Sequence, residues 1–239
     1  IHATAAWKKH RPCRQASLLK CLRKYMSNQR LSVVVPCYNE EATLEAMINK
    51  VLKADIKGLD LEILIIDDAS QDRSVEIAER LEQEHLAIKL AKHPHNQGKG
   101  AALVTGFNLS EGDIVLIQDA DLEYDPIEYP KLLTPIFDEQ ADVVFGSRFS
   151  GGNSHRVLYF WHSVGNKVLT LFSNMMTDLN LTDMETCYKV FRRGVINKLD
   201  LKEKRFGIEP EITAKVSQLN PRPRIYEVGI GYNGRTYGE

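Results

Sequence analysis

The sequence predicts a single α/β domain with a mainly parallel central sheet that is flanked by helices. Apolar strand segments alternate with helical segments through residues 31–145, and strands separated by helices of about 10 to 15 residues form βαβ units with parallel strands. The strand segments are apolar on consecutive residues, as expected for strands that helices cover on both faces. Polar clusters follow four of the strands, at the edge of such a sheet where ligands bind.

Five strands and four helices alternate in the first part of this domain. Each strand segment is a short apolar run, and each helical segment has apolar residues at helical spacing. The predicted strands are 31–35, 61–66, 88–91, 113–117 and 141–145. The predicted helices are 41–53, 72–84, 98–109 and 127–138.

The second part is less regular. A glycine-rich loop over 150–156 precedes the apolar stretch 158–176, which we expect to form a pair of helices or one broken helix. We favour packing in the core for this stretch, and an amphipathic element that lies on lipid is the alternative. A turn over 183–187, a short strand over 188–191, a helix over 209–218 and a late strand over 225–228 complete the prediction.

Composition excludes several classes of protein. The 31 Lys and Arg residues balance 32 Asp and Glu residues, so no general attraction to nucleic acid is expected. The four cysteines lack zinc-site spacing, and we expect Cys37 and Cys187 to be buried thiols. No segment has the roughly 18 to 20 apolar residues that cross a bilayer, although the chain could lie on a membrane or be part of a longer one.

Residues 1–30 contain basic residues and no acidic residue. They could form a basic arm attracted to anionic lipid or an arginine-rich targeting peptide. They could also be translated upstream sequence, with the real start at Met26. We favour the last interpretation, because Met26 leads directly into the first predicted strand.

Two acids, Asp119 and Asp121, follow the strand 113–117. Acids spaced two residues apart beyond a strand can turn toward one point, and Glu123 could supply another oxygen. Magnesium is typically held by one or two carboxylates together with substrate phosphates, and it neutralises charge on a leaving diphosphate. We therefore expect a divalent metal at these acids, rather than a solvated turn.

Further candidate residues follow the other strands. We assign Asp67 to a nucleotide base or ribose, whereas Asp68 could bind ligand or cap the next helix. Lys99 lies between two glycines at a helix start, where backbone N–H groups can approach a diphosphate, with a helix entry that carries a surface lysine as the alternative. Arg148 and Arg235 suit bidentate recognition of phosphate, with surface ion pairs as the alternative.

A set of motifs across residues 31–237 resembles the polyprenyl-phosphate hexosyltransferases, the dolichyl-phosphate mannose and glucose synthase group of the family-two glycosyltransferases. The shared family-two motifs include Val35-Pro36-Cys37-Tyr38-Asn39-Glu40-Glu41, Asp67-Asp68-Ala69-Ser70, Gly98-Lys99-Gly100, Gln118-Asp119-Ala120-Asp121 and Gly146-Ser147-Arg148. The narrower motifs, which indicate a lipid-phosphate acceptor, are Asp183-Met184-Glu185-Thr186-Cys187-Tyr188-Lys189, Phe206-Gly207-Ile208-Glu209-Pro210-Glu211 and Tyr232-Asn233-Gly234-Arg235.

The resemblance implies a GT-A fold over residues 31–239, a Rossmann-like domain that binds nucleotide-sugar and a metal, Mg²⁺ or Mn²⁺, together. The residues that it places at the base and ribose are Pro36, Tyr38, Glu40, Ile65 and Asp67. Those that it places at the diphosphate and metal are Asp119, Ala120 and Asp121, with Glu123 as a further ligand. Arg148 and Arg235 would hold donor or acceptor phosphate, and Asp183 would orient the sugar or acceptor or serve as a structural cap.

The implied activity is inverting, metal-dependent transfer of mannose or glucose from GDP-mannose or UDP-glucose to a dolichyl or undecaprenyl phosphate at the cytoplasmic face of a membrane. His155, Arg156 and the stretch 158–176 are candidates for the lipid side. The resemblance also implies continuation beyond Glu239, toward membrane helices. The alternatives are a family-two transferase with a saccharide acceptor and a non-catalytic nucleotide-sugar-binding protein.

Overall fold

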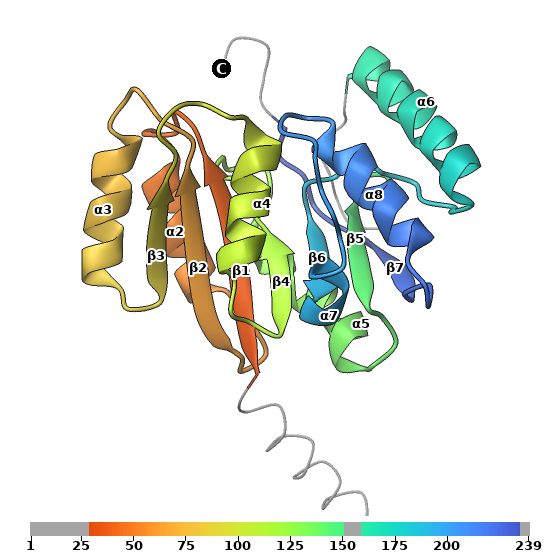
Figure 1. The fold of residues 1–239 in the computed structure, drawn as a ribbon, viewed down its shortest axis with the longest axis horizontal. Coiled ribbons are helices and arrows are strands. Elements are labelled where there is room, and N and C mark those ends of the chain that lie inside the picture. The colour runs from red at the N-terminus through yellow and green to blue at the C-terminus, as the bar shows by residue number, and fades with distance from the viewer. Residues whose placement is uncertain (1–28, 151–158, 235–239) are drawn as a thin grey trace, which may run out of the picture.

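The computed structural model describes residues 29–150 and 159–234, which form one seven-stranded sheet with helices on both faces (Figure 1). The strand order is β3-β2-β1-β4-β6-β5-β7. The strands are β1 (Arg30–Cys37), β2 (Asp60–Asp67), β3 (Ile88–Lys92), β4 (Ile114–Ile117), β5 (Val143–Ser147), β6 (Lys189–Arg192) and β7 (Ile225–Gly229). All seven predicted strands are therefore confirmed, with ends that shift by one or two residues.

The sheet is mainly parallel, as predicted. Strand β1 pairs in parallel with β2 and β4, β2 with β3, and β5 with β7, whereas β6 runs antiparallel between β4 and β5. The chain moves outward from β1 to β3 and then returns to β4 on the other side of β1. At such a reversal of strand order, the two neighbouring loops separate and leave a crevice for ligand.

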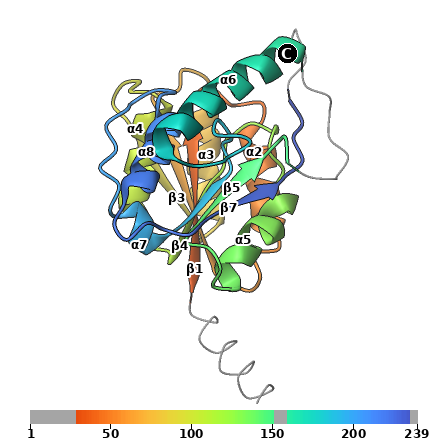
Figure 2. The same ribbon diagram turned by 90° about the vertical axis from the view of Figure 1, so that its right-hand side faces the viewer.

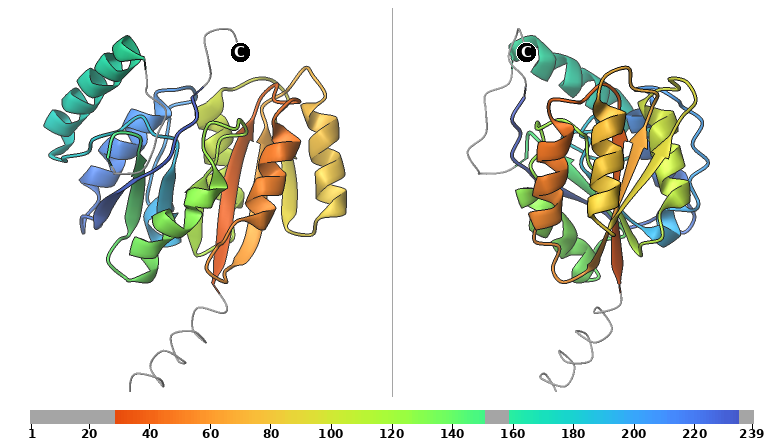
Figure 3. Two further views of the ribbon diagram at one scale, coloured as in Figure 1. Left: turned by 180° about the vertical axis from the view of Figure 1, so that it is seen from behind. Right: turned by 90° about the vertical axis from the view of Figure 1, so that its left-hand side faces the viewer.

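Helices cover the sheet on two sides. Figures 2 and 3 show α2 (Leu44–Lys53) and α5 (Tyr129–Phe137) on one face, and α4 (Lys99–Leu109) and α8 (Ile208–Gln218) on the opposite face. Helix α3 (Ser74–Glu84) packs against β3 and α2. Coverage on both faces explains the continuous apolar strands, since every residue of β4 is buried.

A buried glutamine fixes the loop that leaves β4. The Gln118 side chain is fully buried, and its Oε1 accepts hydrogen bonds of 2.8 Å from the hydroxyls of both Tyr129 and Tyr188. Its Nε2 donates to the Tyr124 carbonyl at 3.2 Å. Because all these groups are buried, losing one partner would leave an unpaired polar group. The loop over residues 118–124 is therefore anchored from within the core.

The stretch 158–176 differs from its prediction. It forms one unbroken helix, α6 (Phe160–Thr177), and only Thr170 and Thr177 of that helix are buried. The interpretation that its apolar residues pack in the core is wrong, because those residues point away from the protein. Within residues 29–150 and 159–234, no helix has the length and apolarity needed to cross a membrane. The short elements η1 (Pro126–Glu128) and α7 (Arg193–Ile196) complete the fold.

Gly106 lets α4 lie close to β1, and this contact yields a stability prediction. A Cβ at Gly106 would collide with Cγ1 of Val34, whereas a Cβ at Gly165 in α6 would have nothing within 4 Å. We expect Gly106→Ala to lower the free energy of unfolding by about 1–3 kcal/mol through overpacking. Gly165→Ala is the matched control and should leave it unchanged or raise it by up to about 1 kcal/mol. Urea unfolding measures both, and equal effects would contradict the close packing.

Candidate active site

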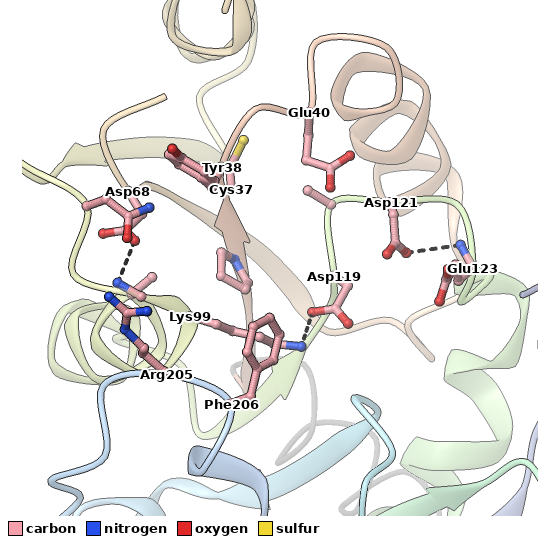
Figure 4. Close-up of a pocket in the computed structure, with 15 residues that line it drawn as sticks. Cys37, Tyr38, Glu40, Asp68, Lys99, Asp119, Asp121, Glu123, Arg205 and Phe206 are labelled. Atoms are coloured by element: carbon pink, nitrogen blue, oxygen red, sulfur yellow. Dashed lines mark hydrogen bonds and ion pairs between the residues drawn. The ribbon is translucent and has the colours of Figure 1, made fainter. Parts of the chain in front are cut away.

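A cavity of about 600 Å³ lies beyond the carboxyl ends of β1 and β4 (Figure 4). This is the place at which the strand order reverses, and its volume suits a small-molecule ligand. It is lined by Pro36, Cys37, Tyr38, Glu40, Asp68, Asn96, Gly98, Lys99, Ala102, Asp119, Ala120, Asp121, Glu123, Arg205 and Phe206. Eight predicted site residues are among them: Pro36, Tyr38, Glu40, Lys99, Asp119, Ala120, Asp121 and Glu123.

The loop after β1 forms one wall and is tied to the loop after β2. The backbone N–H of Asn39 donates to Ser70 Oγ at 2.9 Å, and that of Glu40 donates to Ser74 Oγ at 2.8 Å. Asn39 adopts φ = 56°, a left-handed conformation that asparagine tolerates better than most residues. These bonds hold the Tyr38 ring at the cavity, where it is 43% exposed.

The two acids that end β2 have different surroundings. Asp68 lines the cavity, where its carboxylate accepts from the backbone N–H groups of Gln97 at 2.9 Å and Gly98 at 2.7 Å. Asp67 is 2% exposed, accepts from Ser70 N–H at 3.1 Å, and has an Oδ1 without a hydrogen-bond partner. Ile65 is fully buried in β2 and does not line the cavity. The structure therefore places Asp68 in the cavity lining and Asp67 outside it, and one carboxylate oxygen of Asp67 accepts no hydrogen bond.

The glycines beside Lys99 allow a second loop to close on the start of α4. Gly98 has φ = 99°, and a Cβ there would collide with the carbonyl oxygen of Lys204. The Ala101 N–H donates to the same carbonyl at 3.0 Å. This contact brings Arg205 and Phe206 to the cavity. Phe206 belongs to one of the narrow family motifs but is not among the predicted site residues, and no sequence signal indicated Arg205.

The predicted metal acids do not converge as three ligands. Asp119 Oδ1 lies 2.7 Å from Lys99 Nζ, Asp121 Oδ1 accepts from the Glu123 N–H at 3.0 Å, and Glu123 Oε2 accepts from the Tyr232 hydroxyl at 2.7 Å. Figure 4 shows the first two of these contacts as dashed lines. In the described part of the chain, no group of three or more His, Cys, Asp or Glu side chains is arranged to hold a metal.

A row of alternating charges extends from Asp119 into the protein. Lys99 Nζ lies 3.8 Å from Glu209 Oε1, and Glu209 Oε2 pairs with Lys189, whose side chain is fully buried. Burial disfavours the charged form of Lys99, but the nearby Asp119 and Glu209 carboxylates outweigh it and raise the pKa of Lys99 well above its ordinary value. Lys189 and Glu209 are not among the predicted site residues. The sequence pointed to them only through the family motifs Asp183–Lys189 and Phe206–Glu211, to which they belong.

A second charged group, Arg148 with Asp183, lies beside the cavity rather than in its lining. Arg148 Nε and Nη2 donate to the two oxygens of Asp183 at 2.7 and 2.8 Å, and the Asp183 side chain is fully buried. Burial raises the pKa of Asp183, but its hydrogen bonds with Arg148 and the Arg148 charge outweigh burial and lower it. The two residues form a bidentate ion pair.

Tyr232 connects the two charged groups. Its ring centroid lies 5.2 Å from the Arg148 guanidinium carbon, and its hydroxyl donates to Glu123. The Asn233 N–H donates to the Glu123 carbonyl at 2.9 Å. Burial, followed by the bond to Glu123, raises the pKa of Tyr232 to about 12. One aromatic ring therefore separates Arg148 from the acids of the cavity.

Some predicted residues cannot be placed. Arg235, His155 and Arg156 lie outside the described residues, as do residues 1–28 of the basic N-terminal segment. Cys37 and Cys187 are buried free thiols, as predicted. Burial raises the pKa of Cys37 to about 12, so this thiol stays protonated at neutral pH.

A family model described as glycosyl transferase family 2 matches residues 32–200. The chain belongs to glycosyl transferase family 2. The match includes all four polar strand ends and the Asp183–Lys189 segment, and therefore most of the candidate site. The predicted family is confirmed, and the α/β domain with its mainly parallel sheet is the expected GT-A-like fold.

Relatives of this family-two chain act on lipid phosphates, according to their names. It is 27% identical over 212 residues to a dolichol-phosphate mannosyltransferase of Pyrococcus furiosus, a match that covers 88% of this chain and 58% of the relative. It is 29% identical over 213 residues to an undecaprenyl-phosphate 4-deoxy-4-formamido-L-arabinose transferase of Aeromonas hydrophila subsp. hydrophila, covering 87% and 61%. The chain thus spans about three fifths of the length of these two relatives.

A solved structure shares the family-two fold. Glucosyl-3-phosphoglycerate synthase from Mycobacterium tuberculosis, in complex with Mn²⁺, UDP and glucosyl-3-phosphoglycerate, superposes with a TM-score of 0.68 at 21% identity. The match covers 96% of this chain and 80% of the synthase chain. At this identity the likeness establishes the GT-A-like fold.

The Arg148–Asp183 pair leads to a pH-dependent stability prediction. The folded-state pKa of Asp183 lies below its ordinary value of 3.8, so the pair stabilises the fold above that pH and loses its effect as pH falls through the folded-state pKa. We expect Asp183→Asn to cost roughly 3 kcal/mol at pH 7, since it leaves Arg148 without its buried partner. The difference from wild type should shrink toward pH 3.

Urea unfolding at pH 7, 5 and 3 measures this difference. Asp200→Asn is the control, because Asp200 pairs with Lys202 at 3.4 Å with both side chains at least 75% exposed, and it should change nothing measurable. A difference for Asp183→Asn that is constant across the three pH values would contradict the ion-pair account.

Proposed function

We propose that this chain is an inverting transferase that moves a hexose, mannose or glucose, from a nucleotide-sugar to the phosphate of a dolichyl or undecaprenyl phosphate. The observation that carries the proposal is the contact through Tyr232 between the Arg148–Asp183 pair and the acid-lined cavity. We infer from this contact a single site with two halves. The cavity would be the donor half, for the donor diphosphate, and the region around Arg148 would be the acceptor half, for an acceptor phosphate. The names of the two relatives support a lipid phosphate, and the different sugars in them leave the sugar to experiment.

The chemistry suits a site without a strong general base. A lipid monophosphate is already an anion near neutral pH, so its oxygen can attack the anomeric carbon while the bond to the leaving diphosphate breaks. Attack in line with the leaving group inverts the anomeric centre. The protein must then orient two anions and balance their charge. We assign Lys99 to the donor diphosphate, and Arg148 and Arg235 to donor or acceptor phosphate, with Asp183 holding Arg148.

The acids fit a divalent cation that is bound together with the donor. Their oxygens suit Mg²⁺ or Mn²⁺, and Mg²⁺ is commonly held by one or two carboxylates plus substrate phosphates. Asp119 and Asp121 would hold the cation, with Ala120 between them at the diphosphate and Glu123 as a further ligand. When bound, the cation would neutralise charge on the leaving diphosphate. The Mn²⁺ and UDP in the structural neighbour support this assignment.

The wall formed by the loops after β1 and β2 would receive the nucleoside. Pro36, Tyr38 and Glu40 line the cavity there, and the unpartnered Asp67 Oδ1 is an acceptor that a base or ribose hydrogen would satisfy. Ile65 would support this wall from inside the sheet. The acceptor lipid would bring the enzyme to the cytoplasmic face of a membrane, as a peripheral domain or one anchored by segments outside this chain.

A transfer assay with labelled donor tests the proposal. GDP-mannose and UDP-glucose are offered with Mn²⁺ to undecaprenyl phosphate, to dolichyl phosphate and to free sugars, and we expect label only in a polyprenyl-phosphate product. Label in a free sugar alone would support the saccharide-acceptor alternative. Nucleotide binding without transfer to any of these acceptors would support the non-catalytic alternative.

The same assay tests the acid that faces Lys99. Asp119→Asn removes a charge that the donor half requires, and we expect transfer to fall on the order of 100-fold or more. Asp125→Asn is the matched control from the same loop, because Asp125 lies outside the cavity lining, pairs with the exposed Lys50, and can keep its helix-capping bond as asparagine. Full activity of Asp119→Asn in Mg²⁺ or Mn²⁺ would refute the assignment.

A further inference from the structure

Helix α6 is attached to the protein by its polar side. Asn166, Thr170 and Asn174 recur at intervals of four residues and therefore share one side of the helix. Asn174 alone exchanges two hydrogen bonds with the Leu181 backbone, at 2.8 and 3.1 Å. Asn166 Nδ2 donates to Asp183 Oδ1 at 3.0 Å, and Thr170 Oγ1 accepts from the Met184 N–H at 3.2 Å. A helix on a protein core normally turns its apolar side inward, so α6 is reversed.

The outer side of α6 is apolar and exposed. At 100° per residue, its large apolar side chains fall within about one half of the helix circumference and the three polar anchors in the other half. These side chains are 46–87% exposed, and they are Phe160, Trp161, Val168, Leu169, Leu171, Phe172, Met175 and Met176. They are half of the sixteen exposed large hydrophobic residues in the described part of the chain. A contiguous apolar surface of this kind marks an interaction site.

The position of α6 relates this surface to the site. Figures 1 and 2 show α6 at the end of the molecule where the parallel strands β1 and β4 have their carboxyl ends. The same helix donates, through Asn166, to the Asp183 carboxylate that holds Arg148. The exposed apolar surface and the phosphate-binding arginine are thus joined by two successive side-chain contacts.

The charges of α6 favour an anionic lipid surface over a second copy of the chain. The helix contains Lys167 and no acidic residue. A second copy of α6 would offer this cation no acidic partner, whereas an anionic lipid surface attracts it. Tryptophan is enriched where a membrane meets water, and Trp161 lies near one end of the apolar side, 76% exposed.

We propose that the outer side of α6 inserts into the interface of an anionic bilayer and sets the site against the membrane. The proposal deepens the function proposed above, on which it rests, because a polyprenyl phosphate carries its phosphate at that same interface. The eight apolar side chains leave water, while Asn166, Thr170 and Asn174 keep their bonds to the protein. Arg148 then faces the layer of lipid phosphates.

Fluorescence of Trp161 tests the insertion directly. The chain has two tryptophans, Trp7 and Trp161, so the full-length Trp7→Phe protein reports Trp161 alone. We expect vesicles of phosphatidylcholine and phosphatidylglycerol with brominated acyl chains to quench this emission, and sedimentation to show binding. The double variant Leu169→Glu/Phe172→Glu should bind at least about tenfold more weakly. Leu86→Glu, at a fully exposed apolar residue outside α6, should bind as the parent does.

Three outcomes would overturn the inference: unquenched Trp161 on bound vesicles, equal vesicle binding by the double variant, or a dimer that the double variant dissociates and that does not bind vesicles. Vesicle binding needs neither donor nor acceptor, so it is independent of catalysis. A protein that inserts Trp161 but transfers no sugar refutes the proposed function alone. A protein that transfers sugar to polyprenyl phosphate with Trp161 unquenched refutes the inference alone.

Discussion

The row of charges that runs from Lys189 through Glu209 and Lys99 to Asp119 is the constraint on which the candidate site depends. A charge removed from water is costly unless an opposite charge and hydrogen bonds compensate it. Lys189 lies in β6, and Glu209 lies in the first turn of α8. Lys99 is the first residue of α4, and Asp119 follows β4. Each charge therefore fixes the position of a different element, and the four together hold the floor of the cavity.

The row itself is balanced in charge before any ligand arrives, with two cations and two anions. Lys99 is in contact with the acid that we assign to the metal, so a cation alone must compete with an ammonium group. A nucleoside diphosphate changes that balance, because it offers Lys99 a new anion and offers the cation further oxygens. The Arg148–Asp183 pair is similarly complete without ligand, and its contact with Tyr232 places it next to the same acids. Both charged groups are therefore paired before any ligand binds, and in the proposed function the ligands would exchange partners with them.

Most of the fold could be predicted from the sequence, because the apolar runs are short and four of them end at a polar cluster. Those clusters also gave the cavity residues Tyr38, Asp119 and Asp121, since parallel strands bring their carboxyl ends together, whereas the flanking glycines indicated Lys99. The prediction that the apolar residues of α6 pack in the core failed for a physical reason. Helical spacing shows that a helix has an apolar side, but not whether that side meets protein or the surroundings. The bonds of Asn166, Thr170 and Asn174 to the protein decide its orientation.

The burial of Lys189 and Glu209 could not be predicted from the sequence either. Lys189 and Glu209 belong to residue types that usually lie in water, and their burial depends on partners 20 or more residues away in the sequence. Likewise, adjacent strand-end acids alternate in direction, and a one-residue difference decides that Asp68 lines the cavity while Asp67 does not. Sequence patterns locate such positions to within a residue, whereas pairing in three dimensions assigns the role.

Calorimetric titration of the protein with GDP and with UDP, each in Mn²⁺ and in EDTA, tests the donor half most directly. The account predicts that one nucleotide binds at least about tenfold more tightly in Mn²⁺, which corresponds to about 1.4 kcal/mol. It also predicts that Asp119→Asn removes this difference. Binding of the preferred nucleotide with the same affinity in Mn²⁺ and in EDTA, in both the wild type and the variant, would contradict the account.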